Sequence, residues 1–123
     1  MTVRRQSHMG RLGWYSARLA EQGIIGFVTA DSGRAPKYVA PHGGRSRRLG
    51  TNPLSFAFPA DVDGQVVLDM ATSTVARGKI NVAAARGESI PTGWLVDKEG
   101  KDTTDPRALA NGGALLPFGA DQA

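Results

Sequence analysis

The feature that most constrains the fold is a pair of short apolar segments joined by a turn. Leu54 to Phe58 reads as a strand that Pro59 ends, and Gln65 to Asp69 reads as a second strand. Between them, Asp63-Gly64 is a dipeptide that suits a tight hairpin. Two strands joined so closely pair antiparallel, because a parallel pair needs a long crossover connection.

Two predicted helices flank these strands. Residues His8 to Gln22 carry apolar side chains at helical spacing, and Gly23 is well placed to end that helix. Val75 to Arg86 shows a similar pattern, with Gly87 as its C-terminal cap. Gly78 inside the second helix costs about 1 kcal/mol relative to alanine, which suggests a close approach at that position.

The remaining elements are shorter. Ile24 to Thr29 reads as a buried strand, Trp94 to Val96 as a short strand, and Asp105-Pro106 as the start of a helical turn. No G-x-G-x-x-G stands between a strand and a helix, so a Rossmann dinucleotide site is not supported. We therefore expect an α+β fold with a largely antiparallel mixed sheet and flanking helices.

Length and composition narrow the class of protein. With 123 residues, 41% hydrophobic and 21% charged, the chain fits one globular domain. It has no cysteine, which excludes disulfides and thiolate metal sites. No apolar run approaches the roughly 18 residues that span a bilayer, and the start does not resemble a secretory signal. No His/Asp/Glu cluster has metal-ligand spacing, so we expect no metal. Because the chain has neither a spanning run nor a secretory signal, we expect no membrane partner and a cytoplasmic location.

The net charge of +4 is concentrated in one stretch. No acidic residue stands between Asp31 and Asp61, and the basic side chains of that interval are Arg34, Lys37, Arg45, Arg47 and Arg48. Such a run can meet a phosphate or a nucleic acid, or it can be a solvated loop face. A small basic nucleic-acid-binding protein is the less favoured alternative, because only Tyr38 supplies an aromatic ring near the run.

Two places can carry chemistry. His8 stands just before the first predicted helix, and a neutral histidine there can accept a proton from an alcohol. The alternative is that Ser7 caps the helix and His8 is an exposed first-turn residue. The segment Asp69-Met70-Ala71-Thr72-Ser73 lies at a strand-to-helix junction. A carboxylate there can bind ribose hydroxyls, and the next amides can bind phosphate, or the segment is ordinary helix capping by Thr72, Ser73 or Thr74.

Taken in order, the short motifs of the chain resemble the malate/L-lactate dehydrogenase family, which lacks the Rossmann fold. The residues that carry the resemblance cover nearly the whole chain: Ser7–Gly10, Gly23–Gly26, Pro41–Gly44, Gly50–Pro53, Asp69–Ser73, Gly78–Lys79, Ile90–Trp94, Gly100–Pro106 and Leu115–Pro117.

The resemblance implies a non-Rossmann NAD(P)-binding fold and a chemistry. Hydride would pass between C2 of a 2-hydroxy or 2-oxo acid, such as malate or lactate, and the nicotinamide of NAD or NADP. His8 would be the proton donor and acceptor, while Ser32, Asp69, Met70 and Ala71 would touch the dinucleotide. Family members build their active site in a homodimer, which we expect here too.

The same resemblance implies that residues 1–123 are the central cofactor-binding segment of a longer chain. An N-terminal helical region and a C-terminal segment are expected beyond the two ends. A further hypothesis follows, in which the isolated chain is a catalytically inactive remnant of the family, without measurable 2-oxo-acid reductase activity.

Overall fold

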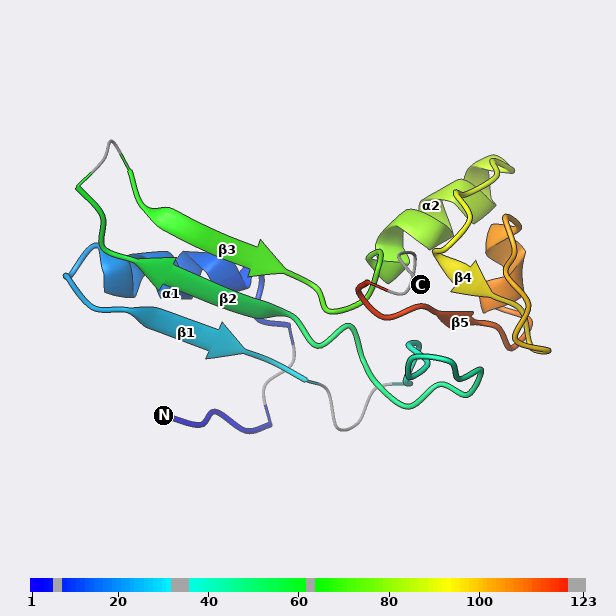
Figure 1. Ribbon diagram of the computed structural model, residues 1–123, viewed down its shortest axis with the longest axis horizontal. Coiled ribbons are helices and arrows are strands. Elements are labelled where there is room, and N and C mark those ends of the chain that lie inside the picture. Colours follow the sequence, from blue (N-terminus) through cyan, green and yellow to red (C-terminus); the bar gives the residue numbers. More distant parts are fainter. Residues whose placement is uncertain (6–7, 32–35, 62–63, 120–123) are drawn as a thin grey trace. The chain divides into compact units, whose positions relative to one another are not determined.

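The computed structural model describes residues 1–5, 8–31, 36–61 and 64–119. Within them the chain forms two compact units (Figure 1). Unit 1 consists of Met1–Ala30 and Pro53–Met70, and unit 2 consists of Asp31–Asn52 and Ala71–Ala123. The chain therefore leaves unit 1, builds part of unit 2, returns, and leaves again.

Unit 1 is one helix on a small sheet. Helix α1 spans Leu12–Ala20, and strands β1 (Gly26–Thr29), β2 (Leu54–Phe58) and β3 (Val66–Met70) form a three-stranded sheet in the order β1-β2-β3. Both pairings are antiparallel, which confirms the predicted pairing of the second and third strands. The predicted turn that joins them lies partly outside the described residues, at positions 62 and 63.

Helix α1 packs on one face of this sheet through small residues. Ser16 and Ser55 are fully buried and share a hydrogen bond of 2.7 Å between their hydroxyl oxygens. A Cβ added to Gly26 would lie 2.5 Å from the carbonyl oxygen of Ser16, so only glycine lets β1 come this close to the helix. The contact between helix and sheet is therefore set by backbone proximity as well as by apolar burial.

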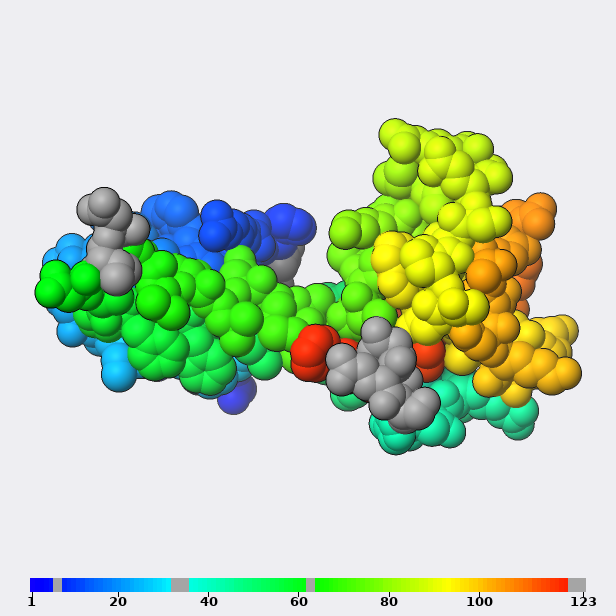
Figure 2. Space-filling view, turned by 45° about the horizontal axis from the view of Figure 1, so that its top comes forward, coloured from blue at the N-terminus to red at the C-terminus, as the bar shows by residue number. Residues whose placement is uncertain are grey.

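The opposite face of the sheet is apolar and exposed. The Phe27 and Phe56 rings stack with their centroids 4.5 Å apart, and Phe58 stacks on Phe56 at 6.4 Å. Phe27 is 56% exposed and Leu68 48% exposed, so the prediction of a buried first strand is wrong. In Figure 2 the atoms of β2 and β3, in green, lie at the surface of unit 1.

Unit 2 holds the larger apolar core. It contains helix α2 (Arg77–Arg86), the 3-10 helix η1 (Pro106–Leu109), and strands β4 (Leu95–Val96) and β5 (Ala114–Leu115), which pair antiparallel. The buried residues of this core are Val39, Val75, Ile80, Ala83, Ile90, Leu95, Leu109 and Leu115. Val39 lies outside all the predicted helices and strands, and it forms isolated β-bridges with both Leu49 and Leu115.

Both long helices begin later than the sequence predicts. The first begins at Leu12 rather than His8, because Gly10 has φ +74 and Arg11 is extended. The second begins at Arg77 rather than Val75, whose side chain is buried in the core of unit 2. Gly87 ends α2 in the left-handed conformation, as predicted.

Candidate functional site

Asp69 lies on the last strand of unit 1, on the face that α1 covers. Its register partner is the buried Ser55, and its side chain is 21% exposed. The Oδ2 atom accepts a hydrogen bond of 3.3 Å from Nε of Arg11, the residue that precedes α1. A Cβ on Gly13 would lie 2.6 Å from the same Oδ2 atom, so glycine makes room for the carboxylate. A partly buried carboxylate is therefore held beside the start of a helix.

His8 is exposed and lies before α1, not in its first turn. The reasoning from the helix dipole therefore does not apply, and the predicted helical position of His8 is wrong. The ring is oriented by the amide of Gly10, which donates a hydrogen bond of 3.0 Å to Nδ1. In the neutral ring this contact places the proton on Nε2.

The hydroxyl groups of Thr72, Ser73 and Thr74 donate hydrogen bonds to backbone carbonyls of unit 2. Thr72 Oγ1 donates to the carbonyl oxygens of Thr51 (3.3 Å) and Asn52 (3.0 Å). Thr74 Oγ1 donates to Leu116 O (3.1 Å), and Ser73 Oγ to Val75 O (2.8 Å). None of these side chains caps α2, whose N-cap is Ala76, so the predicted capping role is wrong.

Two backbone amides in and beside this segment are also occupied. The amide of Thr72 donates to Thr51 O (2.9 Å) and that of Thr74 donates to Leu116 O (2.9 Å). Neither is left to bind phosphate at a helix start. The bonds to Thr51 and Asn52 join the Gly50–Pro53 motif to the Asp69–Ser73 motif.

Asn52 is a site residue that sequence reasoning missed. Its backbone has φ +36, an uncommon conformation for a residue other than glycine. Its Oδ1 atom is buried and has no hydrogen-bond partner among the described residues. A buried acceptor left unpaired is costly, so its presence points to a donor other than the described residues. The signal in the sequence was the Gly-Thr-Asn-Pro motif itself.

The other predicted cofactor contacts are less defined. Met70 and Ala71 are half-buried and stand on the two sides of the boundary between the units. Ser32 lies outside the described residues. The predicted segment from Asp69 to Ser73 therefore runs from unit 1 into unit 2, and its parts are described within their own units.

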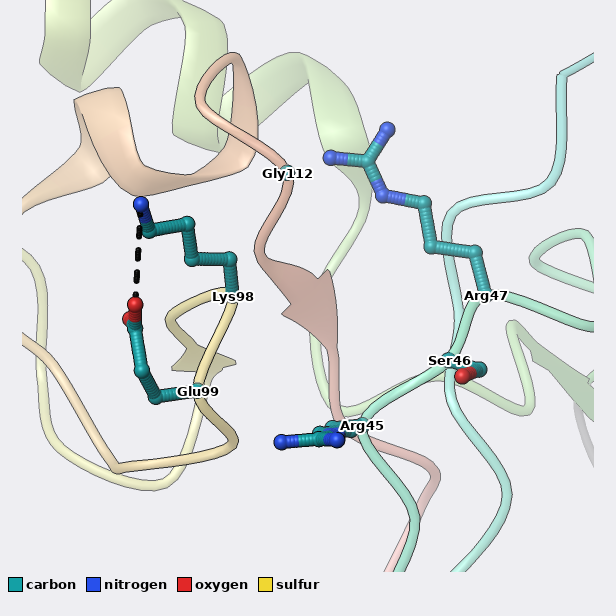
Figure 3. Close-up of a pocket in the computed structure, with 6 residues that line it drawn as sticks. All are labelled: Arg45, Ser46, Arg47, Lys98, Glu99 and Gly112. Atoms are coloured by element: carbon teal, nitrogen blue, oxygen red, sulfur yellow. Dashed lines mark ion pairs between the residues drawn. The ribbon is translucent and has the colours of Figure 1, made fainter.

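The described cations of the basic stretch differ in their contacts, and Arg34 lies outside the described residues. Arg47 is half-buried, and its Nε donates to Gly113 O at 2.7 Å while Nη2 donates to Leu109 O. Its guanidinium also lies 5.8 Å from the centroid of the Tyr38 ring. Arg47 thus fixes its loop against the end of η1. Figure 3 shows Arg47 directed toward Gly112, whereas Arg45 reaches toward the loop of Lys98 and Glu99.

Charge elsewhere serves local structure. Hydrogen bonds from Arg107 hold the pKa of Asp105 below its ordinary value, and the same contact raises the pKa of Arg107. Asp105 also accepts from the amide of Arg107 at the start of η1. The described part of the chain contains no group of three metal-ligating side chains, and none of its helices has the length and apolar character to cross a bilayer.

Comparison with known proteins identifies relatives along nearly the whole chain. Residues 1–122 match the malate/L-lactate dehydrogenase family. A malate dehydrogenase of Pyrococcus horikoshii is 45% identical over 95% of the chain and 31% of its own length. An NADP(+)-dependent (2R)-3-sulfolactate dehydrogenase of Chromohalobacter salexigens is 42% identical over 91% of the chain and 32% of its own length.

A solved structure gives the same result. Delta1-piperideine-2-carboxylate reductase from Pseudomonas syringae superposes with a TM-score of 0.80 and 40% identity, covering 89% of the chain and 32% of the reductase. The chain thus spans about a third of the length of the relatives it matches. Motif order, antiparallel architecture and sequence identity lead to one conclusion: the chain belongs to the malate/L-lactate dehydrogenase family.

Proposed function

We propose that the chain is the central cofactor-binding part of an NAD(P)-dependent oxidoreductase that exchanges hydride with a 2-hydroxy or 2-oxo acid. The single observation that carries the proposal is the Asp69 carboxylate, partly buried at a strand end within a motif of this family. The relatives support the class of substrate, since they are named for malate and for sulfolactate.

The unpaired acceptor of Asn52 is a test of whether the chain fits a dinucleotide. Its buried Oδ1 needs an N–H or O–H donor. A nicotinamide dinucleotide carries such donors in its carboxamide, its ribose hydroxyls and its adenine amine, so the chemistry of the acceptor fits. In this assignment Asp69, within unit 1, accepts from ribose hydroxyls of the cofactor, which when bound supplies the hydride.

His8 is the group assigned to proton exchange. Nδ1 accepts from Gly10, so Nε2 is the nitrogen left to exchange a proton with the substrate oxygen. The charged ring donates from Nε2 when a 2-oxo acid is reduced, and the neutral ring with its remaining proton on Nδ1 takes the proton back at Nε2 when the alcohol is oxidised. Because the charged ring carries a proton on both nitrogens, the Gly10 contact is compatible only with the neutral ring. Charging of His8 therefore requires that contact to be released.

The finer parts of the proposal are a homodimeric assembly, which follows from the family resemblance, and a cytoplasmic location, which follows from the sequence features described above. The competing hypothesis is a catalytically inactive member of the family. If the Asp69 segment of such a member no longer binds a dinucleotide, this hypothesis predicts that neither NADH nor NADPH binds.

Asp69→Ala tests the proposal, by fluorescence titration of NADH and NADPH. A charged hydrogen bond contributes about 1.5–3 kcal/mol, so its loss should raise the Kd about tenfold or more. Arg11→Ala is the matched control, because it breaks the same ion pair and keeps the carboxylate. An equal change in both variants, or no change in either, would contradict the assignment of Asp69 to the cofactor.

A further inference from the structure

A cationic cleft lies in unit 2, and its lining includes none of the residues assigned to the dinucleotide above. It has a volume of about 700 Å³ and is lined by Arg45, Ser46, Arg47, Lys98, Glu99 and Gly112. Three of these side chains are cationic and one is anionic (Figure 3). The cleft therefore carries a surplus of positive charge.

Close backbone approach builds this cleft. A Cβ on Gly100 would lie 3.1 Å from Cβ of Arg45, and one on Gly112 would lie 3.4 Å from Cβ of Lys98. Both glycines also have positive φ, of +89 and +100. Hydrogen bonds from the Arg47 guanidinium to the backbone carbonyls of Leu109 and Gly113 hold the segment of Arg47 in place. The segments that line the cleft are thus held together by the fold.

The cations of the cleft differ in what they bind. Arg47 donates hydrogen bonds from Nε and Nη2 to backbone carbonyls. Arg45 has no hydrogen-bond or ion-pair partner among the described residues, and its side chain is exposed. Within the described part of the chain, Lys98 forms an ion pair with Glu99 alone, at 3.6 Å and with both side chains more than half exposed. An exposed pair of this kind is weak and exchanges readily for another anion.

We propose that Arg45 and Lys98 bind a phosphate monoester in this cleft, with the Ser46 hydroxyl as a further donor. An open cleft suits a compact and strongly charged group, and an arginine fork matches phosphate oxygens in geometry. Two sources share this chemistry. One is the 2′-phosphate on the adenosine ribose of NADP, which rests on the proposed function, and the other is a free phosphorylated small molecule.

Isothermal titration calorimetry of the 123-residue chain tests the site with inorganic phosphate, adenosine 2′-monophosphate and adenosine 5′-monophosphate. We expect Arg45→Gln and Lys98→Gln to weaken phosphate binding about tenfold or more each. Arg48→Gln is the matched control, since Arg48 is an exposed cation of the same stretch and does not line the cleft. Circular dichroism verifies that each variant keeps the fold.

The two nucleotides distinguish the sources, because they carry the same charge at different positions. At least tenfold tighter binding of the 2′-monophosphate assigns the site to NADP, and equal binding assigns it to a free phosphorylated molecule. Failure of all three probes to bind, or binding that neither variant weakens, overturns the proposal. NADH binding without phosphate binding would refute the cleft alone, whereas phosphate binding without any dinucleotide binding would refute the proposed function alone.

Discussion

The close contact between α1 and β1 at Gly26 predicts how much an added methyl group destabilises unit 1. A methyl group added in Gly26→Ala would lie 2.5 Å from the carbonyl oxygen of Ser16 and 2.8 Å from its Cα. Both atoms belong to the backbone of α1, so no side-chain rotation relieves the clash. The helix must move away from β1, and the buried hydrogen bond between Ser16 and Ser55 is then strained as well.

The magnitude follows from overpacking. Inserting one methyl group into a tightly packed interior costs about 1–3 kcal/mol. Gly78→Ala in α2 is the matched control, because its Cβ would meet nothing within 4 Å and its φ is not positive. The same substitution should there stabilise the protein by about 0.4–1 kcal/mol, since alanine restricts the unfolded chain. Sequence reasoning expected a close approach at Gly78, and the structure places none there.

Urea unfolding at one fixed protein concentration measures both effects. The free energy of unfolding should fall for Gly26→Ala and rise for Gly78→Ala, with Trp14 reporting on unit 1 and Trp94 on unit 2. Equal shifts in the same direction would refute the reasoning, because the two substitutions would then act through propensity alone. An unchanged stability in Gly26→Ala would show that α1 does not lie against β1 as described.

Three further outcomes can be measured. The exposed apolar face of unit 1 should make the chain oligomeric or poorly soluble. In sedimentation velocity, Phe27→Thr and Leu68→Thr should each shift the chain toward monomer. Val82→Thr, at a residue 49% exposed on α2, should leave the oligomeric state unchanged. The lowered pKa of Asp105 means that its contribution to stability is present above the ordinary value near 3.8 and is lost as the pH falls through the folded value; an acid titration of stability should lose that component in Asp105→Asn, and an identical pH profile would contradict it. Arg47→Ala should lower the free energy of unfolding of unit 2, because Arg47 binds two backbone carbonyls there; an unchanged free energy of unfolding would contradict this role.

Local sequence determined the elements whose signals are complete within a few residues. Strand β2 has the predicted bounds, Leu54–Phe58, and it pairs antiparallel with the strand after it. Gly87 ends α2 because a left-handed residue there needs no Cβ. The order of short motifs was also enough to place the chain in its family, as the comparisons confirm.

Only the tertiary structure decided what the polar side chains of those motifs do. Thr72 and Thr51 are 21 residues apart, and Arg47 bonds carbonyls more than 60 residues further along the chain. Hydrophobic periodicity carries no information about such distant partners. Whether a hydroxyl caps a helix, binds a ligand or fastens a loop therefore depends on which carbonyl the fold brings beside it. The unpaired Oδ1 of Asn52 was hidden for the same reason, since burial without a partner exists only once the chain has folded.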